Sequence, residues 1–167
     1  IVTTADPTGR YGLRRDNDVA DKCGVTFVDA DGLRRDVPDT REDWDEHVKS
    51  WLTDEQYTCT ADELTACSIT TGITPGVIRE EYGITPEKTV TRCGGTEPGE
   101  RVLDSFINSL SEYPGNISAP SDARTGTSQL SPYLRFGCLS VRHVYQRVKD
   151  CPVSGRPEQM FISRLYW

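Results

Sequence analysis

The chain has 167 residues, of which 26 are Asp or Glu and 19 are Lys or Arg, so its formal net charge is −7. This charge argues against a protein that binds nucleic acid over its whole surface, because phosphate contacts require clustered Lys and Arg. No apolar run approaches the roughly 18 residues that span a bilayer, and no signal-peptide pattern is present, so we expect a cytoplasmic protein without a membrane partner.

Residues 1–37 combine one predicted helix with one predicted strand. The helix is expected over residues 14–20 and the strand over residues 25–29. In the strand, Val25 and Phe27 alternate with small or polar neighbours, and Asp31-Gly32 then turns the chain. This pattern predicts a remnant of an α/β domain.

Residues 38–93 begin with a predicted helix and then lose their periodicity. Thr40 and Asp43 imitate a capping box and open a helix that has an apolar face, formed by Trp44, Val48, Trp51 and Leu52. Farther on, Gly-Ile-Thr-Pro occurs at residues 72–75 and 83–86, around a short helix predicted over residues 77–82. Two copies are too few for a solenoid, so we interpret the region as an interdomain connector.

The six cysteines are predicted to be free thiols. No two of them have the Cys-x-x-Cys spacing of zinc ribbons and redox motifs, and the chain has only two histidines, His47 and His143. Neither histidine receives a role, and no metal site is expected.

Residues 94–126 predict an amphipathic helix followed by a loop. A Gly94-Gly95 turn leads into the helix, whose apolar residues recur at helical spacing. These residues are Val102, Leu103, Phe106, Ile107 and Leu110. The loop over residues 114–126 then delivers the chain to its most informative segment.

Residues 127–142 predict an anion-binding site at the start of a helix. Ser131 followed by Pro132 is typical of an N-cap and first helical residue, and the free amide groups of such an end attract phosphate. Thr127 and Ser128 add hydroxyl groups just upstream, while Gly126 allows the backbone to come close to a ligand.

A second helix follows directly. Gly137 suits the end of the first helix, and Ser140 is expected to cap a helix in which Val141, Val144, Tyr145 and Val148 share a face. Taken alone, this segment fits an anion site and a pair of capped helices in an ordinary helical domain equally well.

The whole segment resembles the FAD-binding signature of the photolyase and cryptochrome family, Thr-Ser-x-Leu-Ser-x-x-Leu-x-x-Gly-x-Leu-Ser-x-Arg. The Gly94-Gly95 helix, Tyr113 and the closing residues 161–167 follow the same family order. The resemblance implies a mainly α fold. Residues 1–37 would be a remnant of the N-terminal α/β domain, 38–93 the connector, and 94–167 part of the helical FAD-binding domain.

The resemblance also implies the site residues. The FAD phosphates would be held by Tyr113, Thr127, Ser128, Gln129, Leu130 and Ser131. Trp167 matches the tryptophan that lines the cavity beside the flavin, and Arg164 stands where many repair enzymes carry a glutamate that binds the pyrimidine dimer. We expect these two residues in the catalytic role.

The sequence departs from the family pattern in three places. Arg164 replaces the glutamate, and Ile117 stands four residues after Tyr113, where the family has an arginine. The chain also begins at Ile1 and stops at Trp167, so we expect an internal fragment that is inactive by itself.

The function implied is that of a deoxyribodipyrimidine photo-lyase, in which light-excited reduced FAD repairs pyrimidine dimers in DNA. The parent protein is expected to be monomeric and to carry FAD with an antenna pigment. A cryptochrome-type blue-light receptor without repair activity is the first alternative. The second is a non-enzymatic helical interaction domain. Six arginines lie from residue 124 onward, namely Arg124, Arg135, Arg142, Arg147, Arg156 and Arg164. They fit a surface that faces DNA or flavin phosphates and fit scattered solvated charges equally well.

Overall fold

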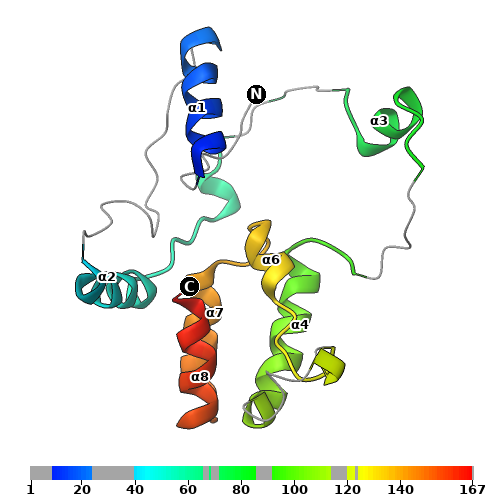
Figure 1. Ribbon diagram of the computed structural model, residues 1–167. Helices are drawn as coiled ribbons and strands as arrows, with labels where there is room; N and C mark the ends of the chain where they lie inside the picture. The colour runs from blue at the N-terminus through cyan, green and yellow to red at the C-terminus, as the bar shows by residue number, and fades with distance from the viewer. Residues whose placement is uncertain are drawn as a thin grey trace. The chain divides into compact units, whose positions relative to one another are not determined.

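A computed structural model describes residues 9–23, 40–65, 68, 72–85, 92–113, 120–122 and 124–166, and every regular element in these ranges is a helix (Figure 1). The α-helices are α1 (Gly9–Cys23), α2 (Arg41–Thr53), α3 (Pro75–Glu81), α4 (Thr96–Ser109), α6 (Ser131–Arg135), α7 (Val141–Lys149) and α8 (Arg156–Leu165). Short 3-10 helices are η1 (Ala61–Glu63), η2 (Leu110–Glu112) and η3 (Pro120–Asp122). The mainly α fold class is confirmed, whereas the strand predicted over residues 25–29 lies outside the described residues.

The chain divides into two compact units, Ile1–Trp51 and Leu52–Trp167. The domain boundaries expected after residues 37 and 93 stay predictions. The first unit contains α1 and most of α2, whose start is capped as predicted because the amide of Asp43 donates to Thr40 Oγ1 at 3.2 Å. On the predicted apolar face of α2, Val48 and Leu52 are fully buried.

The predicted connector contains α3. Thr74 caps this helix by accepting a hydrogen bond from the amide of Val77 at 3.3 Å. Gly72 and Gly83, which open the two Gly-Ile-Thr-Pro copies, both have positive φ angles, 64° and 59°. Each copy therefore begins with a left-handed residue, a conformation that favours glycine.

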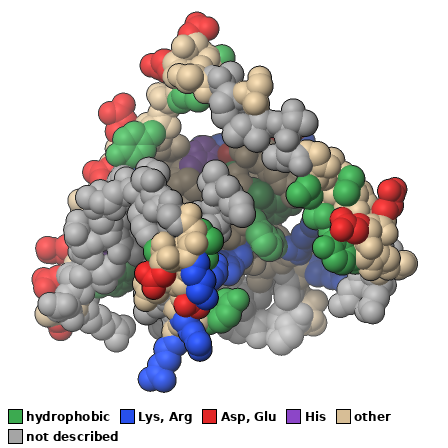
Figure 2. All heavy atoms as spheres, turned by 90° about the horizontal axis from the view of Figure 1, so that it is seen from above, with side chains coloured by type: hydrophobic (Ala, Val, Ile, Leu, Met, Phe, Trp, Pro, Cys, Tyr) green, Lys and Arg blue, Asp and Glu red, His purple; other side chains and the backbone are tan. Residues whose placement is uncertain are grey.

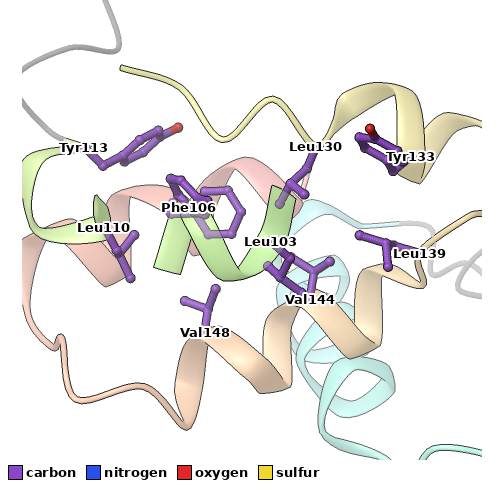
Figure 3. Close-up of a cluster of buried hydrophobic side chains, with 10 residues drawn as sticks. Leu103, Phe106, Leu110, Tyr113, Leu130, Tyr133, Leu139, Val144 and Val148 are labelled. Carbon is purple, nitrogen blue, oxygen red and sulfur yellow. The ribbon is translucent and has the colours of Figure 1, made fainter. Parts of the chain in front are cut away.

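The core of the second unit lies between α4, α7 and α8, with the residues around α6 closing one side (Figure 3). Leu103, Leu110, Val144 and Val148 are fully buried, as the helical spacing of α4 and α7 predicts. The centroid of the Phe106 ring lies 4.6 Å from the centroid of the Phe161 ring. The ten buried members of this cluster are Leu103, Phe106, Leu110, Tyr113, Leu130, Tyr133, Leu139, Val144, Val148 and Phe161.

Helix α6 differs from the prediction at its start and agrees with it at its end. The first helical hydrogen bond runs from the amide of Leu134 to the carbonyl of Leu130 at 3.0 Å, so Leu130 is the N-cap and Ser131 is already helical. Ser131 was therefore wrongly predicted as the N-cap, since its hydroxyl lies beyond the capping position. Gly137 ends the helix with a φ of 66°, as predicted.

A close approach fixes α4 against the turn between α6 and α7. A Cβ atom on Gly99 would lie 3.0 Å from Leu139 Cγ and 3.1 Å from Tyr133 Cδ1. Tyr133 in turn donates from its hydroxyl to the carbonyl of Cys93 at 3.0 Å, which holds the residues before α4 against α6. This packing sets the width of the space beside α4.

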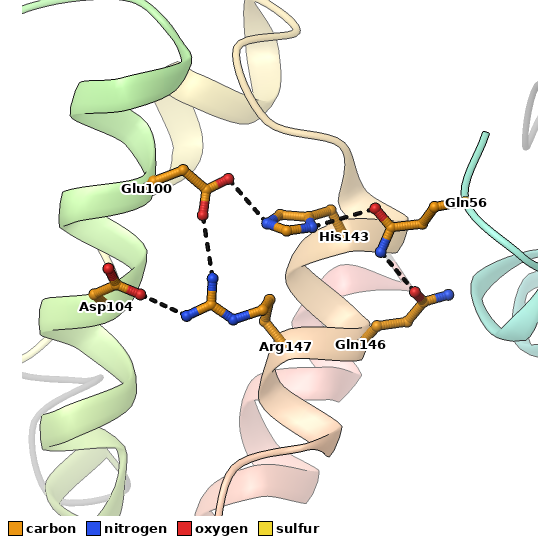
Figure 4. A network of polar contacts seen from close by, with 6 residues as sticks. All are labelled: Gln56, Glu100, Asp104, His143, Gln146 and Arg147. Carbon is orange, nitrogen blue, oxygen red and sulfur yellow. Dashed lines mark hydrogen bonds and ion pairs between the residues drawn. The ribbon is translucent and has the colours of Figure 1, made fainter. Parts of the chain in front are cut away.

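Polar side chains also connect α4 to α7, on the sides where the two helices face each other (Figure 4). His143 Nε2 lies 2.9 Å from Glu100 Oε1, and Arg147 bridges Glu100 at 3.3 Å and Asp104 at 2.5 Å. Gln56 extends the network by contacting His143 Nδ1 at 3.3 Å. Ser140 occupies the N-cap of α7 as predicted, but its hydroxyl makes no capping hydrogen bond.

Five cysteines, Cys23, Cys59, Cys93, Cys138 and Cys151, are free thiols, and Cys67 lies outside the described residues. Among the described helices, none combines the length and apolar character needed to cross a bilayer.

Candidate functional site

An open cleft of about 890 Å³ lies beside α4 in the second unit. Helix α4 supplies one wall, through Pro98, Arg101, Val102, Ser105, Phe106 and Ser109. The segment before α4 contributes Arg92 and Cys93. The remaining residues come from the segment that leads into α6, together with α6 itself, and they are Arg124, Thr125, Thr127, Ser128, Gln129 and Tyr133.

The helical repeat explains why α4 presents these side chains together. Residues three or four positions apart lie on one face of a helix, and Arg101, Ser105 and Ser109 have this spacing. The hydroxyl of Ser109 donates to backbone carbonyls of its own helix, at 3.2 Å to Phe106. The cleft wall on α4 therefore combines one arginine and two serines with the apolar side chains of Pro98, Val102 and Phe106.

A tight turn positions the opposite wall. The amides of Thr125 and Gly126 donate to the carbonyl of Asp122, at 3.0 Å and 2.6 Å. This turn holds Thr125 in the cleft, and Gly126 is buried beneath it. Residues 127–129, which belong to no regular element, then line the cleft on the way to α6.

Gln129 has an unusual backbone and links the two sides of the cleft. Its φ of 56° is the only positive value recorded for a residue other than glycine in the described part of the chain. Its side-chain oxygen accepts a hydrogen bond from Arg92, and its side-chain nitrogen donates to Thr127 Oγ1. Such a backbone costs about 1–3 kcal/mol and clusters at functional sites.

The six residues predicted to hold a cofactor do not all lie in this cleft. Thr127, Ser128 and Gln129 line it. Leu130 is only 1% exposed, and its side chain packs into the core. Its carbonyl accepts from the amide of Leu134, and its own amide donates to Ser128 Oγ. Ser131 is exposed at the start of α6 and is not part of the lining.

The sixth residue, Tyr113, lines a smaller adjoining cavity together with Gly126 and Thr127. Figure 3 shows its hydroxyl on the side of the core where the segment leading into α6 passes. Burial raises the pKa of the Tyr113 phenol, and the charge and hydrogen bond of Arg164 offset this only in part. The two residues are therefore neighbours across η2 and α8.

Of the two residues predicted to be catalytic, only Arg164 belongs to the described part of the chain. Arg164 is exposed near the end of α8 and interacts with Tyr113. Trp167 lies outside the described residues.

Sequence analysis missed the part of the cleft that comes from before and along α4. Arg92, Arg101, Ser105 and Ser109 received no role, because α4 was interpreted through its apolar residues alone. The polar side chains at three- and four-residue spacing on α4, together with Arg92 two residues before the Gly94-Gly95 turn, are the signal that was available.

The cleft differs in charge from the rest of the chain. Figure 2 shows acidic side chains at several separate places on the face in view. In contrast, the cleft combines guanidinium, hydroxyl and amide donors with the apolar Val102 and Phe106. This donor set suits an anionic ligand that also has a flat or apolar part.

The chain is 34% identical over 74 residues to a protein named deoxyribodipyrimidine photo-lyase from Alkalihalophilus pseudofirmus. This match covers 44% of the chain and 15% of that protein. No protein-family model matches the chain, and neither does any solved structure.

Proposed function

We propose that this chain is part of a protein of the photolyase and cryptochrome family and that its cleft binds FAD. The observation that carries the proposal is the gathering of Thr127, Ser128 and Gln129 in one cleft with cationic residues. The partial similarity to a deoxyribodipyrimidine photo-lyase supports it.

The residues of the cleft fit the chemistry of FAD. Thr127 and Ser128 offer hydroxyl donors to phosphate oxygens, and Phe106 and Val102 offer an apolar surface to a ring. Tyr113 adjoins Thr127 in the neighbouring cavity and would extend the set of phosphate donors. Bound FAD would supply light-driven electron transfer, while these residues bind and orient it.

Repair of pyrimidine dimers in DNA is the activity we propose for the full-length protein, with Trp167 facing an extruded base. Stacking of a base on an aromatic ring contributes about 1–3 kcal/mol. Flavin-based blue-light reception without repair is the second candidate. The observation that favours it is Arg164, which interacts with Tyr113 and stands where the family resemblance places a dimer-binding glutamate.

The test is the visible absorption of the purified chain after incubation with FAD and removal of free ligand. We expect a flavin band for the original chain and its loss in a Thr127→Ala, Ser128→Ala variant. Ser111→Ala changes an exposed serine outside the cleft and serves as the matched control. An original chain that retains no FAD would contradict the proposal for this chain.

A further inference from the structure

We propose that Arg92, Arg101 and Arg124, which line different sides of the cleft, together bind the pyrophosphate group of a dinucleotide there. The inference rests on the proposed function for the identity of the dinucleotide, FAD. It assigns phosphate recognition to Arg92 and Arg101, which sequence analysis left without a role, and to Arg124, which lies outside the signature segment.

The first argument is the charge of the lining. Three of the fourteen residues that line the cleft are arginines, and none of these described lining residues is Asp or Glu. The chain as a whole has 26 acidic and 19 basic residues. The cleft thus concentrates positive charge on an acidic protein, and this focuses anions toward it.

The second argument is that the three guanidinium groups have few strong interactions with acidic partners. Arg124 forms no ion pair with an acidic residue in the described part of the chain. Arg92 donates to the neutral side chain of Gln129, and one such bond leaves most of its five N–H donors for a ligand. Arg101 pairs with Glu97 at 2.7 Å, but this pair is exposed and therefore weak.

The third argument is the position of the arginines around the hydroxyl groups. Arg92 reaches Gln129, whose amide donates to Thr127, so one continuous set of polar contacts joins Arg92 to the signature segment. Arg124 precedes Thr125 in the turn on that same side, and Arg101 projects from α4. A phosphate group held by Thr127 and Ser128 would thus lie in a cleft that three separate segments line with arginine.

The chemistry of the guanidinium group suits this role. Guanidinium groups bind phosphate oxygens in bidentate geometry. Arg92 and Arg124 supply this chemistry from outside the signature segment.

Titration of the full 167-residue chain with inorganic pyrophosphate and, separately, with FAD tests the inference. We expect Arg92→Gln and Arg124→Gln each to raise the Kd for both ligands by about tenfold. Arg124→Lys should recover only part of the affinity, because an ammonium group has no bidentate fork. Arg135→Gln removes an exposed arginine outside the cleft and should leave both values unchanged.

The outcomes separate the two proposals. If the original chain binds FAD and the Arg92 and Arg124 variants bind it equally well, the role of the arginines is overturned and the proposed function stands. If pyrophosphate binds in an arginine-dependent way but FAD does not bind, the anion site stands and the flavin function fails. Circular dichroism of each variant establishes that it is folded before binding is compared.

Discussion

Arg142 Nη1 donates a hydrogen bond to the carbonyl oxygen of Glu55 at 3.1 Å, across 87 residues of sequence. The side chain is only 5% exposed, and its second nitrogen lies 3.9 Å from Asp54 Oδ2. Gln146, one turn farther along α7, donates to the carbonyl of Asp54 at 2.8 Å. The last arginine of the signature segment therefore anchors residues 54–55 to α7 and does not line the cleft.

We expect Arg142→Met to lower the free energy of unfolding by about 1–3 kcal/mol, because it leaves a carbonyl without its charged donor. Urea denaturation followed by circular dichroism measures the change. Arg79→Met, at an exposed position on α3, should have little effect. A variant at Arg142 that unfolds at the original urea midpoint would show that the anchor contributes nothing.

Truncation of the central core residue gives a second prediction. Leu103 is fully buried between α4 and α7, so Leu103→Ala should lower the free energy of unfolding by about 2–5 kcal/mol. Leu64→Ala makes the same chemical change at a side chain that is 66% exposed. Equal thermal midpoints for the two variants would refute the assignment of Leu103 to the core.

The close approach of α4 predicts an unusual response to alanine. In an exposed helix Gly→Ala stabilises by about 1 kcal/mol, and Gly76→Ala in α3 should do so because its Cβ would meet only Thr74 Oγ1 at 3.5 Å. Gly99→Ala should instead destabilise by about 1–3 kcal/mol, since Leu139 and Tyr133 must move. Thermal unfolding of both variants decides the sign.

The contacts between α4 and α7 should contribute modestly. Arg147 and Asp104 are 40% and 55% exposed, so a double-mutant cycle with Arg147→Met and Asp104→Asn should give a coupling of about 1 kcal/mol or less. The coupling should shrink as sodium chloride rises from about 0.1 M to about 1 M. A larger coupling that is insensitive to salt would mean that the pair is shielded from solvent.

Alkaline pH should destabilise the second unit through Tyr113. Burial raises the pKa of its phenol in the folded chain. As the pH rises past about 10, the ordinary tyrosine pKa, Tyr113 therefore ionises in the unfolded chain before it ionises in the folded chain. The free energy of unfolding should therefore be constant below that pH and fall as pH rises through the folded pKa. Lys149 acts in the same direction, because its hydrogen bond to Glu158 at 2.6 Å raises its pKa.

Stability measured against pH for Tyr113→Phe provides the check on this slope. The variant has no group to ionise at this position, so its stability should decline less between about pH 10 and pH 12. Tyr82→Phe, which changes an exposed tyrosine, is the control. An unchanged slope for Tyr113→Phe would place the alkaline transition elsewhere.

Local rules in the sequence were sufficient for the buried faces of α4 and α7 and for the end of α6. The spacing of Leu103 and Leu110 predicted the buried face of α4, and that of Val144 and Val148 predicted the buried face of α7. Gly137 marked the end of α6, since its left-handed backbone favours glycine. These features depend on residues within a few positions of one another, so periodicity and capping chemistry suffice to find them.

Tertiary packing decided which residues line the cleft and which lie outside it. Leu130 turned its side chain into the core, Ser131 stayed exposed, and Arg92 came into contact with Gln129 across 37 residues. The sequence alone determined the buried faces of α4 and α7, because helical periodicity is a local property. Only the packing of α4 against α6 and α7 determined which arginines line the cleft, because Arg92, Arg101 and Arg124 come from separate segments that no local pattern relates.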